Sequence, residues 1–478
     1  MSKTIKEIIE QSGIKFGTSG ARGLVVDFTP EVCTAFTVSF LDAMKKSFEF
    51  KKVEVAMDNR PSSPKIAATI CGTIESYGFE VDFYGVLPTP ALALQSMTDN
   101  IPSIMITGSH IPFDRNGIKF YTPVGEISKD DENAIINNEN IIISTKSNLP
   151  QIKDTATINY MNRYTNFFGS NCLKDLKIGI YEHSSAGRDL YSELFTSLGA
   201  EVISLGRSDE FIPIDTEAVS DIDKQRAKDW SSEYSFDTIF STDGDGDRPL
   251  ISDENGEWLR GDIVGLLTSK YLHIEALAVP VSCNTAIEKS GLFKEVLRTK
   301  IGSPYVIEAF EELKFYKSFA GFEANGGFLL GSTLNQDEKV LDALPTRDAL
   351  LPFIVLLSQV VKEKRSLSTL STFVQDLPQR FTSSDRIQEF PRENSLKLIE
   401  KGLLDTDVLI KNIVLEDQKV ANVNQTDGLR LTLEDDSIIH LRPSGNAPEL
   451  RCYVETNNQE LSDNLVKQVL SSIRDIEL

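Results

Sequence analysis

The chain has 478 residues, with 71 Asp and Glu against 49 Lys and Arg, so its formal net charge is −22. Hydrophobic residues make up 40 % and charged residues 25 %, which excludes a disordered, collagen-like or disulfide-scaffold protein. An acidic chain repels nucleic acid and anionic lipid, so we expect neither as a partner. A small anionic substrate remains compatible with this charge if its site is a local cationic cleft.

At roughly 100–200 residues per domain, the length predicts three or four domains. No apolar run approaches the ~20 residues needed to span a bilayer, and the first residues lack the apolar core of a signal peptide. We therefore expect a cytoplasmic protein with no membrane segment. Five scattered cysteines and only four histidines favour reduced core thiols over disulfides or a zinc site. The cysteines are Cys33, Cys71, Cys172, Cys283 and Cys452.

Apolar runs of four to six residues alternate with helical patterns in the first part of the chain, which is typical of an α/β sheet. A second round starts near Lys177 and a third near Gly261. A polar stretch at 362–371 indicates a linker, and the last part mixes strands with helices. The predicted strands are 53–57, 80–84, 103–107, 119–121, 177–181, 201–205, 237–241, 278–281 and one ending near Gly321. The predicted helices are 64–77, 188–198, 263–272, 287–293 and 460–473.

The loop Thr107–Pro112 follows an apolar strand, at the end of an α/β sheet where ligands bind. Three interpretations compete for Ser109: a serine-hydrolase elbow, a plain turn, and a serine that carries a phosphoryl group. The elbow is disfavoured because its GxSxG pattern is absent, and His110 is a poor base for an adjacent side chain. Downstream, Asn116-Gly117 predicts a turn, and Lys119 adds a cation at the start of a new strand.

The segment Asp243–Arg248 places carboxylates at three alternate positions, which can converge on one hard cation. An EF-hand is disfavoured because Arg248 stands where that loop requires Gly and because a strand precedes the segment. An acidic turn at the surface, without a bound metal, is the alternative that assigns the segment no function. A Mg²⁺ site formed by Asp243, Asp245 and Asp247 fits better, with Arg248 as a second positive charge on a phosphoryl group.

Two further loops offer ligand-binding groups. The segment Gly321–Gly327 carries a carboxylate and an amide, which hydrogen-bond sugar hydroxyls well, although a glycine-rich turn is the commoner meaning. The segment Arg442–Arg451 offers backbone N–H groups, a hydroxyl and two arginines, which is a plausible phosphate nest. Thr18–Gly23 again joins Ser-Gly to an arginine, and Asp58–Ser63 is a further polar turn. The sequence has no Walker A loop and no GxGxxG fingerprint.

In this order the loops resemble those of the α-D-phosphohexomutase superfamily. Its pattern runs TSGxRG, D-x-R-x-S-S, T-x-S-H-x-P, DGDxDR, G-E-x-S-G and R-x-SGTEP-x-x-R, and the matches span residues 18 to 451. The resemblance implies three successive α/β domains with mixed sheets and a smaller C-terminal α+β domain around a central cleft. The implied domains are 1–150 with the phosphoserine loop, 151–257 with the metal loop, 258–368 with the sugar loop and 369–478 with the phosphate loop.

The resemblance also implies a role for each loop. Ser109 would carry the phosphoryl group and, with the three aspartates, hold Mg²⁺. The catalytic set would be completed by Arg22, His110, Lys119 and Arg248. Substrate-binding residues would be Thr18, Ser19, Glu323, Asn325, Arg442, Ser444, Gly445, Asn446 and Arg451.

The implied activity interconverts hexose 1-phosphate and hexose 6-phosphate through a hexose 1,6-bisphosphate, which also acts as an activator. Segments 213–217 and 377–386 most resemble phosphomannomutases, so mannose phosphate is the expected substrate, with glucose phosphate as a further one. The sugar and phosphate loops depart from the family pattern. Asn325 replaces a serine, Gly327 a histidine, and Asn446-Ala447 a Thr-Glu pair, so these changes put the sugar specificity in question.

Three alternatives stay open. A phosphoglucosamine mutase differs only in its sugar. A non-catalytic phosphosugar-binding relative would be expected to lose Ser109, an aspartate or Arg248, yet all are present. A Mg²⁺-dependent phosphatase would not need both a sugar loop and a phosphate loop. The partner expected in each case is a small phosphosugar, and the expected assembly is a monomer or a homodimer.

Overall fold

The protein is described here by a computed structural model, which covers residues 3–17, 20–143, 145–363, 369–413, 418–444, 448–474 and 476. Its two compact units are Met1–His273 with Ala320–Thr372, and Ile274–Phe319 with Phe373–Leu478. Mixed α/β sheets confirm the predicted fold class, whereas the boundaries of the four predicted domains stay a prediction. In the part of the chain that the structure covers, no helix is long and apolar enough to cross a membrane.

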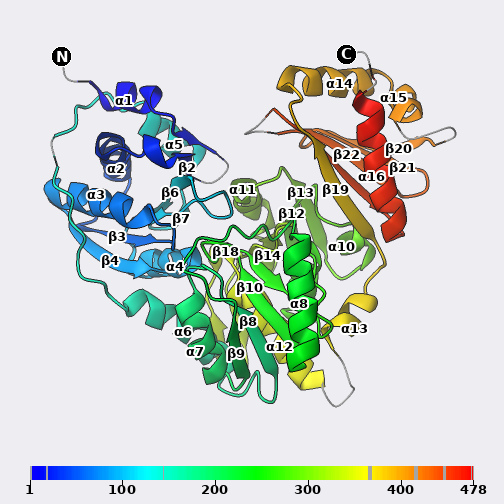
Figure 1. The fold of residues 1–478 in the computed structure, drawn as a ribbon, viewed down its shortest axis with the longest axis horizontal. Helices are drawn as coiled ribbons and strands as arrows, with labels where there is room; N and C mark the ends of the chain where they lie inside the picture. Colours follow the sequence, from blue (N-terminus) through cyan, green and yellow to red (C-terminus); the bar gives the residue numbers. More distant parts are fainter. Residues whose placement is uncertain are drawn as a thin grey trace. The chain divides into compact units, whose positions relative to one another are not determined.

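The first unit begins with a mixed sheet in the order β1-β2-β6-β5-β3-β4, with β7 paired to β6. In β3, Val53, Val55 and Met57 face a core shared with α1, α2, α3 and α5, because alternate side chains of a strand share a face. Figure 1 shows this sheet in blue with α2 and α3 beside it. The strands are β1 Lys15–Phe16, β2 Ala21–Leu24, β3 Lys52–Met57, β4 Glu80–Val86, β5 Ser103–Ile106, β6 Arg115–Thr122 and β7 Gly125–Glu126. The helices are α1 Ile5–Gln11, η1 Val25–Asp27, α2 Pro30–Met44, α3 Ser63–Ser76, α4 Thr89–Asp99, α5 Lys129–Ile136 and α6 Thr155–Phe168.

The turn predicted at Asn116-Gly117 is wrong, because both residues lie inside β6 and pair with β2. Gly117 serves close packing there. A Cβ at this position would lie 2.6 Å from the carbonyl oxygen of Thr107 and 3.0 Å from that of Ala21. The neighbouring backbone therefore approaches Gly117 more closely than a side chain would allow, and such close approach is a common reason for glycine in a strand.

A four-stranded sheet follows in the order β11-β10-β8-β9, drawn in green in Figure 1. Strands β8, β9 and β10 are parallel, and β11 returns antiparallel to β10. The predicted strands 177–181 and 201–205 are confirmed with the same bounds. The acidic segment 243–248 is the connection from β10 to β11. The elements are β8 Lys177–Tyr181, α7 Arg188–Ser197, β9 Glu201–Leu205, α8 Asp221–Tyr234, β10 Thr238–Thr242 and β11 Pro249–Ile251.

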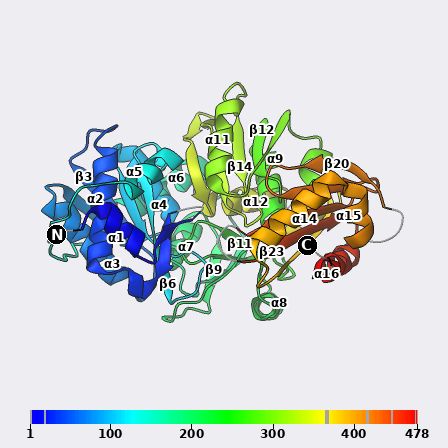
Figure 2. The same cartoon turned by 90° about the horizontal axis from the view of Figure 1, so that it is seen from above.

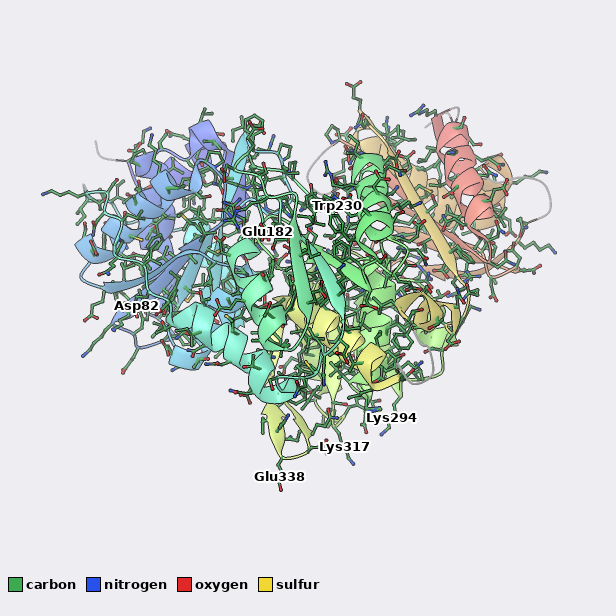
Figure 3. The ribbon with its side chains drawn as sticks, turned by 60° about the horizontal axis from the view of Figure 1, so that its bottom comes forward. Asp82, Glu182, Trp230, Lys294, Lys317 and Glu338 are labelled. Atoms are coloured by element: carbon green, nitrogen blue, oxygen red, sulfur yellow. The ribbon has the colours of Figure 1, made fainter. Side chains whose placement is uncertain are left out.

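The rest of the first unit carries the predicted sugar loop between the antiparallel strands β14 and β15, and β15 pairs with β18. Strands β16 and β17 form a separate hairpin, and Figure 3 shows Glu338 at its tip. The predicted linker is shorter than expected, because α12 reaches Glu363 and α13 starts at Leu370, while 364–368 lie outside the described residues. The elements are α9 Gly261–Tyr271, β14 Phe319–Phe322, β15 Phe328–Leu330, β16 Leu334–Gln336, β17 Lys339–Leu341, β18 Leu344–Asp348, α12 Leu350–Glu363 and α13 Leu370–Gln375.

The second unit contains an antiparallel sheet in the order β19-β23-β22-β21-β20. Alternate residues of its strands form one core with α14, α15 and α16, which Figure 2 shows gathered at this sheet. The unit also holds the parallel pair β12 and β13 with α10 and α11. The elements are β12 Ala276–Pro280, α10 Ala286–Lys289, β13 Glu295–Thr299, α11 Ser303–Leu313, β19 Phe381–Ile387, α14 Arg392–Leu404, α15 Thr406–Ile413, β20 Val420–Asn424, β21 Leu429–Leu433, β22 Ile438–Pro443, β23 Leu450–Thr456 and α16 Gln459–Arg474.

Candidate active site

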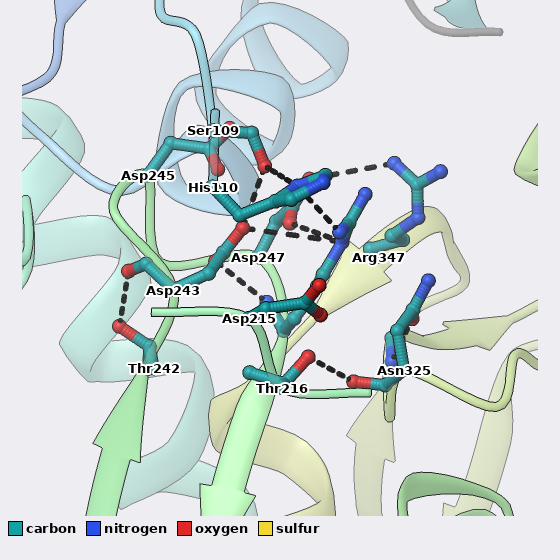
Figure 4. A network of polar contacts seen from close by, with 12 residues as sticks. Ser109, His110, Asp215, Thr216, Thr242, Asp243, Asp245, Asp247, Asn325 and Arg347 are labelled. Carbon is teal, nitrogen blue, oxygen red and sulfur yellow. Dashed lines mark hydrogen bonds and ion pairs between the residues drawn. The ribbon is translucent and has the colours of Figure 1, made fainter. Parts of the chain in front are cut away.

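Ser109 lies at the carboxyl end of β5, in the loop that leads into β6. Its φ of 55° falls in the left-handed region, which a non-glycine residue occupies only when its surroundings hold it there. The buried hydroxyl donates a hydrogen bond to Asp243 Oδ2 at 2.6 Å, and the backbone N–H donates to Thr107 Oγ1 at 2.8 Å. Figure 4 shows Ser109 turned toward the three aspartates. The loop thus presents its serine to the acidic segment, as expected for a reacting hydroxyl.

Arg60 holds this loop in place from the polar turn after β3. Its guanidinium is 1 % exposed, and its Nε donates to Asp58 Oδ2 at 3.1 Å. The two Nη atoms donate to four backbone carbonyls of the loop at 2.6 to 2.9 Å, those of Ser109, Ile111, Pro112 and Arg115. The guanidinium also lies 4.0 Å from the centroid of the Phe211 ring. Arg60 therefore acts as a scaffold for the unusual backbone of the serine loop.

The three aspartates predicted to hold a metal converge between β10 and β11. Asp243, Asp245 and Asp247 are buried, and they offer carboxylate oxygens within 4.8 Å of one another. Lys119 Nζ, from β6, donates to Asp245 Oδ2 at 2.6 Å and to Asp247 Oδ2 at 2.8 Å. One cation thus offsets part of the charge of three buried carboxylates.

The chemistry of this donor set fits a divalent cation. The Oδ1 atoms of Asp245 and Asp247 are buried and accept no hydrogen bond from the described residues. A buried carboxylate oxygen without a partner is unfavourable unless a cation satisfies it. Hard cations such as Mg²⁺ prefer oxygen ligands of this kind. The three aspartates are therefore arranged as a site that could hold a divalent cation, and their role as metal ligands stays a prediction.

Charges in this cluster shift one another's pKa. Burial, reinforced by the charges of its two neighbours, raises the pKa of Asp243. Burial acts in the same direction on Asp245, yet the ammonium of Lys119 holds the pKa of that carboxyl below its usual value. Conversely, burial disfavours the charge of Lys119, but Asp245 and Asp247 raise its pKa. Lys119 is therefore a cation at neutral pH.

His110 lies beside the serine, and two arginines, Arg248 and Arg22, lie close enough to this histidine to act on its charge. Arg248 Nη1 donates to His110 Nδ1 at 2.9 Å, and the same ring nitrogen is 3.5 Å from Ser109 Oγ. Burial and then the charge of Arg248 lower the pKa of His110 to about 3, so the ring is neutral at pH 7. Burial and then Arg248 also lower the pKa of Arg22 to about 10, and the buried Nε of Arg22 has no hydrogen-bond partner among the described residues. His110 is thus a poor base for Ser109, as expected, while both arginines stay cationic.

The predicted sugar loop lies in the same unit. Glu323 and Asn325 are 3 % and 8 % exposed, and Asn325 Oδ1 accepts a hydrogen bond from the backbone N–H of Gly327 at 3.0 Å. The amide oxygen is therefore used inside the loop. Thr216 Oγ1 donates to the carbonyl oxygen of Asn325 at 2.7 Å, which ties the loop to the segment 213–217 noted in the sequence.

Arg347, at the end of β18, was not singled out by its sequence. Its Nε donates to Glu323 Oε2 at 2.5 Å, and its Nη1 lies 3.5 Å from Asp247 Oδ2. Figure 4 shows its guanidinium on the side of the aspartate cluster. The sequence around it resembles an ordinary strand, so no motif marks it. Arg60, by contrast, does belong to the D-x-R-x-S-S turn, although nothing in that motif connects it with Ser109.

The predicted phosphate loop lies in the second unit. Arg442 on β22 and Arg451 on β23 face each other directly across the sheet, where like charges repel unless an anion lies between them. Arg442 Nε donates to Asp427 Oδ2 at 2.8 Å, and the same oxygen accepts from the backbone N–H of Ile301 at 3.0 Å. Arg392 Nη1 donates to the carbonyl oxygen of Ser444 at 3.1 Å. The predicted residues Thr18, Ser19, Gly445 and Asn446 lie outside the described residues.

The chain matches family models over most of its length. Residues 13–144 match phosphoglucomutase/phosphomannomutase α/β/α domain I, residues 260–381 match α/β/α domain III, and residues 383–472 match the C-terminal domain. A phosphomannomutase of Salmonella muenchen is 55 % identical over 469 residues, which cover 98 % of this chain and 97 % of that protein. A phosphoglucosamine mutase of Bacillus licheniformis is 27 % identical over 483 residues, 97 % of this chain and 98 % of that protein.

A solved structure supports the fold. The open form of the Paramecium phosphoglucomutase pp63/parafusin superposes with a TM-score of 0.75 at 16 % identity, over 96 % of this chain and 94 % of that one. The family models cover well over half of the chain, and the serine, acidic and predicted sugar loops all belong to one compact unit. The chain belongs to the phosphoglucomutase/phosphomannomutase family of the α-D-phosphohexomutase superfamily and is a phosphohexomutase of the phosphomannomutase type.

Proposed function

We propose that the protein interconverts mannose 1-phosphate and mannose 6-phosphate, and also accepts glucose phosphates, with Ser109 as the phosphoryl carrier. The observation that carries the proposal is the position of the Ser109 hydroxyl, 2.6 Å from Asp243 in a buried cluster of aspartates. Two cations lie at this cluster, since Lys119 donates to Asp245 and Asp247, and Arg248 donates to His110 next to the serine. Cations placed around a reacting oxygen stabilise the negative charge of a transferring phosphoryl group. The strong similarity to a phosphomannomutase favours mannose over glucosamine as the sugar.

The reaction follows in two transfers. A hydroxyl oxygen of the sugar monophosphate attacks the phosphorus on Ser109, so that a P–O bond to the sugar forms and the bond to Ser109 Oγ breaks. The hydroxyl proton passes to a nearby base. The resulting 1,6-bisphosphate then returns its other phosphoryl group to Ser109 Oγ by the reverse chemistry. The same bisphosphate, added in trace amount, would phosphorylate Ser109 at the outset and so act as the activator.

The remaining residues bind, orient and neutralise. Asp243, Asp245 and Asp247, with an oxygen of the phosphorylated Ser109, would hold Mg²⁺, which supplies Lewis-acid stabilisation of the phosphoryl group when it is bound. Glu323 and Asn325 bind sugar hydroxyls. Arg442, Ser444 and Arg451 bind the phosphate that is not reacting, together with the predicted Gly445 and Asn446. Thr18 and Ser19 are further predicted substrate-binding residues. The cytoplasmic location and the monomeric or homodimeric state stay predictions of the sequence.

The test is phosphorus NMR of the protein with Mg²⁺, a trace of hexose 1,6-bisphosphate and, in parallel, the 1-phosphates of mannose, glucose and glucosamine. We expect conversion to the 6-phosphate, fastest for mannose, and none with Ser109→Ala. Ser47→Ala, at an exposed serine, serves as the matched control and should turn over like the wild type. Free phosphate as the main product would instead establish a phosphatase, and full turnover by Ser109→Ala would refute the phosphoserine mechanism.

A further inference from the structure

The side chain of Arg347 packs against Gly327 of the sugar loop and fills the space in which a side chain at position 327 would lie. A Cβ at position 327 would lie 2.5 Å from Arg347 Cδ and 2.8 Å from its Cγ. The φ of Gly327 is not positive, so space rather than backbone conformation requires glycine here. This is also the position where the family pattern carries a histidine. The arginine therefore occupies the space that a side chain at 327 would need. A larger residue at 327 could be accommodated only if Arg347 moved.

The guanidinium of Arg347 is the partner of a buried carboxylate. Arg347 is 3 % exposed and Glu323 is 3 % exposed, and the bond between Nε and Oε2 is 2.5 Å long. A buried carboxylate needs such a partner, and a charge-assisted bond to arginine also fixes its orientation. The loop backbone adds to this constraint, because Glu323 N–H donates to the carbonyl oxygen of Gly327 at 3.1 Å. Arg347 thereby sets the direction in which Glu323 presents its carboxylate.

We propose that Arg347 is a positioning residue for sugar recognition. Its side chain lies in the space left free by the absence of a side chain at Gly327, and from there its guanidinium orients the carboxylate of Glu323. The inference rests on the proposed function, in which Glu323 binds sugar hydroxyls. Hydroxyls are read by directional hydrogen bonds, so a rotated carboxylate discriminates less between sugars that differ in one hydroxyl.

The experiment compares Arg347→Gln, Arg347→Lys and Gly327→Ala with the wild type, using mannose 1-phosphate and glucose 1-phosphate at saturating Mg²⁺. For Arg347→Gln we expect the KM for mannose 1-phosphate to rise about tenfold, with kcat changed by less than about threefold. The preference for mannose over glucose should shrink at least about threefold. Arg347→Lys should recover part of the loss, because an ammonium keeps the charge but lacks the planar fork.

Gly327→Ala tests the shared volume without removing the guanidinium. Its Cβ would displace Arg347, so KM should rise in the same direction as for Arg347→Gln. A double-mutant cycle with Glu323→Gln adds a direct measure, since Arg347→Gln should add little once the carboxylate is gone. Arg226→Gln removes a matched ion pair with Asp223 on α8 and should leave the sugar kinetics unchanged.

The outcomes are separable. An unchanged KM in both Arg347→Gln and Gly327→Ala would overturn the inference while leaving the mutase intact. A rise in the Mg²⁺ requirement with unchanged sugar kinetics would also overturn it, since Arg347 would then act through Asp247, whose Oδ2 lies 3.5 Å away. Absence of mutase activity in the wild type would refute the proposed function instead. If Arg347→Gln fails to fold, Gly327→Ala alone decides the question.

Discussion

Every N–H group of the Arg60 side chain donates a hydrogen bond, one to a carboxylate and four to carbonyl oxygens. A lysine in its place keeps the charge but cannot reach five acceptors, because an ammonium has three donors and no fork geometry. The Ser109 backbone, held at a φ of 55°, would then lose its main support. The geometry of Ser109 is thus decided by a residue some fifty positions away in the chain.

We therefore predict that Arg60→Lys lowers kcat by about 10–100-fold and the free energy of unfolding by about 2–3 kcal/mol. Arg115→Lys makes the same exchange at an exposed position at the start of β6, directly after the serine loop, and should leave both quantities near the wild-type values. Steady-state kinetics and urea unfolding measure the two effects. Wild-type kcat in Arg60→Lys would show that the loop keeps its shape without the guanidinium.

Glu54 is a buried carboxyl that the mechanism does not use. It lies on β3, accepts one hydrogen bond from the Tyr84 hydroxyl at 3.1 Å, and has an Oε2 atom without a hydrogen-bond partner among the described residues. Burial, and then the charge of Asp99, raise its pKa to about 9. In the unfolded chain the same group ionises near pH 4.3. Between these two values the folded protein keeps a proton that the unfolded chain releases.

The contribution of Glu54 to the free energy of unfolding is therefore fully present at low pH and is lost as the pH rises from about 4.3 to about 9. Within this window the free energy of unfolding falls by at most ~1.4 kcal/mol per pH unit because of this group. Glu54→Gln removes the titration and keeps a hydrogen-bonding side chain of similar size. We expect its free energy of unfolding to fall less steeply between pH 5 and pH 9 than that of the wild type. Urea titrations across that range test this, and parallel curves would mean that Glu54 is ionised in the folded protein.

At the scale of elements, helix α3 and the segment 145–148 pack without space for a side chain. A Cβ at Gly72, inside α3, would lie 1.7 Å from the carbonyl oxygen of Lys146. The segment is anchored there, since Asn148 N–H donates to the carbonyl oxygen of Ala68 at 2.9 Å. Helix propensity alone would favour alanine over glycine by about 1 kcal/mol, but the clash with backbone outweighs this gain.

Gly72→Ala should consequently lower the free energy of unfolding by about 1–3 kcal/mol, against the sign that helix propensity gives. Lys65→Ala, at an exposed position of the same helix, should change it by no more than about 0.5 kcal/mol. Chemical denaturation of both variants provides the measurement. A stabilised Gly72→Ala would show that segment 145–148 yields easily and contributes little to the packing of α3.

At the scale of the whole molecule, the three aspartates predicted to hold a metal belong to one of the two compact units. A ligand that binds only the folded state stabilises it by about 2.7 kcal/mol at a concentration of 100 Kd. We therefore expect Mg²⁺ to slow hydrogen exchange in 103–122 and 238–251, which contain the serine and metal loops, and to leave 429–456 unchanged. Asp247→Asn should abolish the protection. Equal protection in both regions would mean that binding stabilises the chain as a whole.

Sequence patterns predicted much of this fold correctly because strands and helices here follow local rules. The runs 177–181 and 201–205 are short, apolar and bounded by turns, and both are strands with those bounds. The error at Asn116-Gly117 has a non-local cause. These residues are favourable in turns, but the glycine is needed because the backbone of Thr107, just after β5, and of Ala21, in β2, packs against it. Turn propensity cannot report on such packing.

The sequence by itself predicted the serine loop, the acidic loop and the family, since each motif is a short run of residues whose chemistry is distinctive. Only the tertiary structure decided what holds them. Arg60 and Arg347 come from a distant turn and a distant strand, and their importance lies in the carbonyl oxygens and carboxylates to which they donate hydrogen bonds. These hydrogen bonds depend on the packing of segments far apart in the chain, because a buried guanidinium is stable only where the surrounding fold supplies its acceptors.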